Sequence, residues 1–194
     1  VCDVKENEKT LFFFAYDDVE SIEYFKKPLK SYWNRNGKTI LEAIKEASDD
    51  YENTLKRCNE FSEKLYSDAI NVGGEKYSEL LLLAYRQVIA AHKLVLDENG
   101  EILYISKECN SNGCAATVDV SYPSTPLFLL YNPELVKGMM RPIYKYAESD
   151  EWTFDFAPHD VGQYPLVNGQ VYGGNQLKYQ MPVEECGNML VMET

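Results

Sequence analysis

The feature that most constrains the fold of this chain is a series of apolar residues at helical spacing across residues 40–69. The apolar positions recur every three or four residues, which places them on one face of an α-helix. They are Ile40, Ile44, Ala47, Tyr51, Leu55, Cys58, Phe61, Leu65 and Ala69. The pattern predicts one long amphipathic helix, and a chain that carries it is expected to be mainly α-helical.

Two glycines, Gly73 and Gly74, predict the end of this helix, and helical spacing resumes near Tyr77. The second helix presents a broad apolar face made of Leu80, Leu81, Ala84, Tyr85, Val88, Ala91 and Leu94. Because a short glycine turn joins the two helices, we expect an antiparallel helical hairpin. The two apolar faces predict burial of Ile44, Leu55, Leu81, Ala84 and Val88.

A small β-hairpin is expected directly after the second helix. Apolar residues at 93–96 and 102–105 flank a turn that ends in Asn99-Gly100. Asn-Gly readily adopts the positive backbone angles of a tight turn, which favours a strand pair at this point.

The ends of the chain carry weaker signals. An aromatic run at residues 10–16 resembles a buried strand, and a short helical stretch is expected at residues 22–29. We therefore expect residues 1–35 to be an entry segment or linker, and residues 36–194 to form a helical domain. Helical patterning returns at residues 126–147, where Pro133 and Pro142 are expected to segment the helix.

A last helix is expected from Pro182, with acidic residues in its first turn and an apolar stripe at residues 189–192. No partner for this stripe is evident in the sequence. We expect the helical domain to be truncated here, with native sequence continuing beyond Thr194 and an apolar edge left exposed.

The charge balance excludes two classes of partner. The chain has 19 Lys and Arg against 31 Asp and Glu, a net charge of -12, which repels phosphate backbones and anionic lipid headgroups. We expect no nucleic-acid partner. Apolar runs are far shorter than the roughly 20 residues of a membrane helix, so no membrane span is expected.

Five cysteines form no CxxC pair, which argues against a structural zinc site. Cys109 and Cys114 bracket a turn, so either a disulfide or two free thiols is possible, with free thiols preferred. The serine, zinc-protease and nucleotide motifs GxSxG, SxxK, HExxH, GxxxxGK and GxGxxG are absent. We expect no metal and no cofactor, although calcium binding by Asp119, Asp155 or Asp160 stays open without an EF-hand pattern.

Candidate functional residues crowd two long loops, at residues 106–123 and 148–180, and the start of the last helix. The polar residues in these places are Lys107, Glu108, Asp119, Asp155, His159, Asp160, Tyr164, Asn168, Gln170, Glu184 and Glu185. Carboxylates from separate segments that meet on one rim can supply a general acid and a general base. Structural roles are equally open, since Asp119 suits a cap and Glu184 and Glu185 suit any helix N-terminus.

Three segments of this sequence resemble the glutaminase A family. They are Asn112-Gly113-Cys114-Ala115-Ala116-Thr117-Val118-Asp119-Val120, Phe156-Ala157-Pro158-His159-Asp160-Val161-Gly162 and Met181-Pro182-Val183-Glu184-Glu185-Cys186-Gly187-Asn188-Met189. Weaker similarity covers residues 15–18 and 83–87. The resemblance implies a β-rich domain followed by an (α/α) six-hairpin toroid, of which this chain would be the junction and the first part. The preceding domain and the remaining hairpins would then be its partners within one longer chain.

The resemblance also implies a secreted or cell-envelope hydrolase that converts glutamine to glutamate and ammonia. Asp119 and either Glu184 or Glu185 are the candidate acid and base, and we expect Asp119, Asp160 and one of these glutamates to converge. Candidate substrate-binding residues are Lys107, Glu108, His159, Asp160, Tyr164 and Asn168. The chain by itself is expected to be inactive.

Two other functions stay open. The loop aromatics Trp152, Phe154, Tyr164 and Tyr172 could stack on sugar rings, which would suit a toroid that acts on glycans as a glycoside hydrolase does. A binding module of the cell envelope without catalysis is the third hypothesis.

Overall fold

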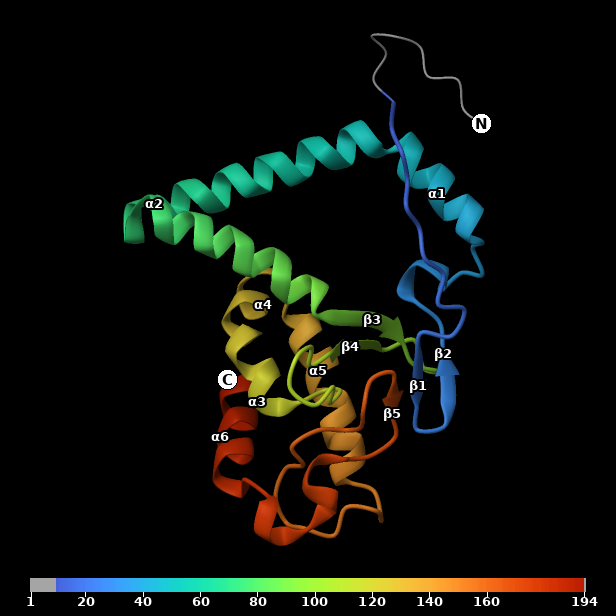
Figure 1. Ribbon diagram of the computed structural model, residues 1–194, viewed down its shortest axis with the longest axis vertical. Coiled ribbons are helices and arrows are strands. Elements are labelled where there is room, and N and C mark those ends of the chain that lie inside the picture. The colour runs from blue at the N-terminus through green and yellow to red at the C-terminus, as the bar shows by residue number, and fades with distance from the viewer. Residues whose placement is uncertain (1–9, 194) are drawn as a thin grey trace.

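The computed structural model describes residues 10–193 and shows a mainly helical chain in which one long helical hairpin extends from a mixed body (Figure 1). The helices are α1 (Ile40–Asp49), α2 (Tyr51–Ala90), α3 (Val118–Ser121), α4 (Thr125–Tyr131), α5 (Pro133–Ala147) and α6 (Pro182–Glu193). The strands are β1 (Ile22–Tyr24), β2 (Lys27–Leu29), β3 (His92–Leu96), β4 (Ile102–Ser106) and β5 (Leu166–Val167). Short 3-10 turns are η1 (Tyr32–Asn34), η2 (Tyr122–Ser124), η3 (Tyr172–Asn175) and η4 (Leu177–Tyr179).

The expectation of one helix across residues 40–69 is wrong, because the helix breaks at Asp50. This residue lies between α1 and α2 with φ of −99° and ψ of 7°. Its carboxylate accepts hydrogen bonds from the side chains of Asn53 and Thr54, at 2.9 and 2.6 Å. Asp favours such local contacts over a helix interior, which explains the interruption.

The expected helical hairpin is confirmed, with its turn at Gly74. There α2 reverses direction, since Gly74 has φ of 78° and leaves the helical conformation. The two arms meet through the rings of Phe61 and Tyr85, whose centroids lie 4.9 Å apart.

Burial of the hairpin is lower than its apolar faces predict. Leu55 and Ala84 are exposed, which contradicts the expectation, while Ile44, Leu81 and Val88 are half-buried. The hairpin extends away from the body (Figure 1), so its faces have few neighbours to pack against.

The β-hairpin predicted around Asn99-Gly100 is confirmed. Strands β3 and β4 pair antiparallel, with Lys93 opposite Ile105, and Gly100 adopts φ of 80°. Helix α5 lies across β4 so closely that a Cβ added to Gly138 would lie 3.1 Å from the carbonyl of Ile102. Residues of α5 and β4 together supply much of the buried hydrophobic core.

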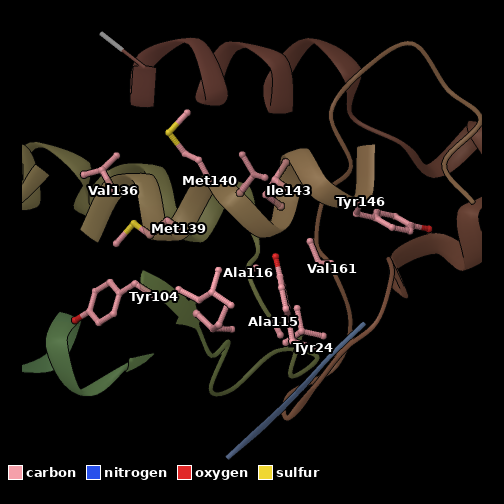
Figure 2. Packing of buried hydrophobic residues seen from close by; sticks show 14 of the residues in the cluster. Tyr24, Tyr104, Ala115, Ala116, Val136, Met139, Met140, Ile143, Tyr146 and Val161 are labelled. Carbon is pink, nitrogen blue, oxygen red and sulfur yellow. The ribbon is translucent and has the colours of Figure 1, made fainter. Parts of the chain in front are cut away.

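Figure 2 shows how α5 divides the core between two layers. Met140 points toward α6, whereas Met139 points toward Tyr104 of β4, and both methionines are buried. Pro133 starts α5, as expected, but Pro142 lies within the helix without ending it, which corrects the predicted segmentation.

The N-terminal segment differs from its prediction. Residues 10–16 are exposed and form no strand, and residues 22–29 form the strands β1 and β2 in place of a short helix. β1 also pairs parallel with β5, with Glu23 opposite Leu166. A long-range sheet, which local spacing does not reveal, therefore ties this segment to the second long loop.

Helix α6 packs against α3 and α5, which buries Met189 and Met192. The expected exposed apolar edge is therefore limited to Leu190 and Val191. Cys109 and Cys114 are both free thiols. Over residues 10–193, no helix combines the length and apolar character that a membrane crossing requires.

Candidate functional site

The candidate site lies where the loop before α3, the loop at residues 157–163 and the first turn of α6 meet. Backbone hydrogen bonds tie the two loops together: the N–H of Val118 donates to the carbonyl of His159 at 2.9 Å, and the N–H of Val161 donates to Ala115 at 3.0 Å. Helix α3 also contacts α6. Asp119, His159 and Glu185 are thereby held on three separate segments that share one place.

Gly162 allows the second loop to turn at this place. Its φ is 142°, and an added Cβ would lie 2.0 Å from the carbonyl oxygen of Leu166. No side chain fits at that distance, so the loop that carries His159 requires glycine here.

Asp160 is the anchor of the site. It is 0% exposed, and its carboxylate accepts four hydrogen bonds. The backbone N–H groups of Gly162, Val171 and Tyr172 donate to it at 2.9, 3.1 and 3.2 Å, and Nδ1 of His159 lies 3.0 Å from Oδ2. Because all of its accepting capacity faces fixed donors, Asp160 serves to position its neighbours.

His159 is buried and held on three sides. Its backbone N–H donates to Oε1 of Gln170 at 2.7 Å, and its ring stacks on Tyr172 with centroids 4.1 Å apart. An ionised carboxylate only accepts hydrogen bonds, so the proton lies on Nδ1 toward Asp160. This leaves Nε2 on the opposite side of the ring, 3.8 Å from Oδ1 of Asp119.

The electrostatic balance around His159 favours its charged form. Burial by itself lowers the pKa of the imidazole, but the hydrogen bond to Asp160 and its charge raise it, with smaller contributions from Glu185 and Asp119. The pKa of His159 is therefore raised above its ordinary value.

Glu185 is the third member of the cluster and the least satisfied. It is 1% exposed, and neither carboxylate oxygen has a hydrogen bond of normal geometry among the residues that the structure describes; a looser contact with the amide of Asn188 lowers its pKa slightly. Burial raises the pKa of Glu185 to about 8, with added repulsion from Asp119 and Glu184 and opposing attraction from His159. A buried carboxylate without partners is costly, so it marks a place where a ligand or a proton is expected.

One donor atom from each of Asp119, His159 and Glu185 lies within 4.8 Å of the other two. The side chain of Asp119 is 31% exposed, which connects the cluster to solvent. Of the three carboxylates expected to converge, Asp119 and Glu185 meet in this cluster, whereas Asp160 contacts His159 on the opposite side of its ring. Its neighbour Glu184 is exposed on the solvent side of α6.

Of the other residues that the sequence indicated, some border the cluster of Asp119, His159 and Glu185 and others lie away from it. Glu108 borders the cluster: Thr117 donates to it at 3.3 Å, and burial together with the charges of Asp119 and Asp160 raises its pKa. Lys107 instead lies over the ring of Tyr164, with Nζ 5.4 Å from the centroid.

Asn168 is held elsewhere, between strands of the N-terminal sheet. Its Nδ2 donates to Glu23 at 2.6 Å, and its Oδ1 accepts from the backbone N–H of Lys26 at 2.8 Å. Neither Lys107 nor Asn168 therefore forms part of the cluster.

Sequence reasoning did not identify two residues as positioning His159. Tyr172 covers the ring of His159, and Gln170 holds its backbone while donating to Gln180 at 2.8 Å. The sequence offered one signal for this role, the polar side chain of Gln170 within the second loop.

Comparison with protein families supports one relationship. A model described as "Glutaminase A six helical-hairpin domain" matches residues 74–194, and another described as a domain of unknown function, DUF5127, matches residues 1–68. All members of the cluster lie within the first match.

Two curated relatives are similar along nearly the whole chain. The protein named "Glutaminase A" from Aspergillus oryzae is 33% identical, over 97% of this chain and 28% of its own length. A protein named "Probable glutaminase" from Arthroderma benhamiae is 29% identical, over 91% of this chain and 22% of its own length. The chain thus spans about a quarter of these relatives. No solved structure matches.

Proposed function

This chain belongs to the glutaminase A family, and from that premise we propose that it is part of a longer hydrolase that releases ammonia from the side-chain amide of glutamine. The observation that carries the proposal is the meeting of Asp119, His159 and Glu185 within 4.8 Å. The names of the two relatives support the choice of substrate.

Amide hydrolysis requires a water made nucleophilic at the carbonyl carbon and a proton delivered to the departing nitrogen. Two carboxyl groups and an imidazole that face one point are suited to bind and orient that water and to exchange protons with it. Asp119 connects them to solvent, and the hydrogen bond to Asp160 keeps Nε2 of His159 directed at Asp119. Asp119, His159 and Glu185 are therefore the proposed reacting groups, and Asp160 and Gln170 position His159.

The same proposal includes the larger architecture. The two arms of α2 are one helical hairpin, and a toroid of six such hairpins would place the cluster at the end of a central cavity. Residues 1–35 would link the hairpin domain of residues 36–194 to a β-rich domain. A secreted or cell-envelope location stays a prediction from the family resemblance.

Action on glycans is the second candidate, but its motivating aromatics have other roles in the fold. Trp152 is buried, packs edge-on against Phe154 and donates from its indole N–H to the carbonyl of Phe156 at 2.7 Å. Tyr172 stacks on His159. Neither ring is left as an open platform for a sugar.

An assay of the full-length protein separates these candidates. We expect ammonia release from L-glutamine and no release of reducing sugar from plant and fungal cell-wall glycans. Reducing sugar without ammonia would replace the proposed function by the glycan hypothesis. Binding of either ligand without turnover would favour the binding module.

A further inference from the structure

The cluster of Asp119, His159 and Glu185 contains more unpaired acceptors than a packed interior normally tolerates. Oδ1 of Asp119 and both oxygens of Glu185 are buried, and none has a hydrogen bond of normal geometry in the described part of the chain. In the same range, neither carboxylate forms an ion pair with a lysine or arginine; their charged neighbour is His159. Two buried carboxyl groups that share one imidazole and have no lysine or arginine beside them indicate a place for a cation.

We propose that Nε2 of His159, Oδ1 of Asp119 and a carboxylate oxygen of Glu185 bind one divalent transition-metal ion, with Zn²⁺ as the best fit. This proposal deepens the proposed function and rests on it for the reaction. Imidazole nitrogen together with carboxylate oxygen suits zinc, whereas calcium and magnesium prefer oxygen ligands alone. Three protein ligands are the number that catalytic zinc sites use.

The surroundings of His159 match those of a metal ligand. Metal-binding histidines usually donate their second ring N–H to a carboxylate, which fixes the tautomer and the direction of the free lone pair. Here Nδ1 donates to Asp160 at 3.0 Å, and the stacked ring of Tyr172 limits rotation of the imidazole. Nε2 is therefore directed at the two carboxylates before any ion binds, and it would give up its proton when an ion takes that place.

A competing set of donors nearby is excluded by its hydrogen bonds. Cys114, His159 and Asp160 also lie within 4.8 Å of one another. However, Asp160 already accepts from three backbone N–H groups, and Nδ1 of His159 is directed at Asp160 itself. Only the Asp119 side of His159 is open to an ion.

The ion would give the proposed hydrolysis its nucleophile. A bound Zn²⁺ acidifies a coordinated water and polarises a carbonyl oxygen. Hydrolysis of the amide consumes that water, which supplies oxygen to the new carboxylate and hydrogen to ammonia, so no oxidant or reductant is required. Asp119, the partly exposed ligand, lies on the side from which water and substrate would enter.

The test is metal analysis of the full-length protein. After dialysis against ZnCl₂ and then metal-free buffer, mass spectrometry of the metal content should find one Zn²⁺ per chain. Metal-free protein titrated with CoCl₂ should develop visible absorption bands that Zn²⁺ abolishes. Glu185→Gln and Asp119→Asn should each weaken zinc binding at least ~100-fold, and Asp160→Asn roughly 10- to 100-fold, because Asp160 orients His159. Glu193→Gln, the same change at an exposed position of α6, should not affect binding.

Each result bears on one proposal. Wild-type protein that binds neither Zn²⁺ nor Co²⁺, or Glu185→Gln protein that binds zinc like wild type, would overturn the metal site. Ammonia release that persists in the metal-free protein would overturn the role of the ion in the hydrolysis while the proposed function stands. Stoichiometric zinc in a protein that does not hydrolyse glutamine would leave the metal site intact and overturn the proposed function.

Discussion

The side chains of His159 and Asp160, consecutive in sequence, meet with Nδ1 3.0 Å from Oδ2 in a site where both residues are buried. Adjacent side chains on an extended backbone usually point apart. The turn enforced by Gly162 and the donors of residues 171 and 172 bring them together. The orientation of His159 toward Asp119 follows from this pair, and so does the chemistry of the cluster.

Asp160→Asn should destabilise the protein by about 2–3 kcal/mol, because an amide nitrogen would face backbone donors where a carboxylate oxygen now accepts from them. Denaturant unfolding of the full-length protein measures this loss. Asp150→Asn is the matched control, since Asp150 is exposed, and it should change stability by less than about 0.5 kcal/mol. Equal stability of both variants would contradict the anchoring role of Asp160.

Gly162→Ala should cost at least ~3 kcal/mol or prevent folding, since its Cβ would collide with the carbonyl of Leu166 at a φ that alanine avoids. Gly187→Ala is the control within α6. An added Cβ there meets no atom within 4 Å, and alanine should stabilise the helix by up to about 1 kcal/mol. Thermal unfolding of the two variants should therefore shift in opposite directions.

His92 should make the fold sensitive to acid. Its Nδ1 lies 2.6 Å from the carbonyl of Val88, its ring stacks on Tyr104, and burial lowers the pKa of His92 to about 4. In the unfolded chain the imidazole gains a proton near pH 6.5, so the unfolded state binds more protons between pH 6.5 and 4. This contribution to stability is complete above pH 6.5 and is lost as the pH falls to 4, amounting to up to about 3 kcal/mol.

His92→Asn retains a donor for Val88 but does not titrate. Its free energy of unfolding should be lower at neutral pH, because ring packing is lost, and should change less than that of wild type between pH 6.5 and 4. Parallel slopes for the two proteins over this range would show that His92 does not cause the acid sensitivity.

Local features were predictable from the sequence because they depend on neighbouring residues. Gly74 and Gly100 adopt positive φ angles that few other residues tolerate, so both hairpins form where they were expected. Burial was less predictable. The spacing of Leu55 and Ala84 shows which face of the helix is apolar but not what covers it, and both are exposed.

The candidate site was predictable in its members but not in their arrangement. Glu184 and Glu185 are equivalent by sequence, yet successive helical residues point about 100° apart, and the packing of α6 against α3 and α5 decides which of them is buried. Asn168 belongs to the same polar loop as Asp160, but the parallel pairing of β1 with β5 draws it toward Glu23. Pairing between distant segments leaves no periodic signal, so these differences required the fold.

The turnover of Glu185→Gln in the full-length protein tests the central claim most directly. This change keeps the shape of the side chain and removes the carboxylate from the cluster with Asp119 and His159. We predict that kcat for ammonia release from L-glutamine falls at least ~100-fold, with unfolding temperature nearly unchanged, while Glu193→Gln retains wild-type turnover. Wild-type kcat in folded Glu185→Gln protein would contradict the claim that this cluster is the catalytic centre.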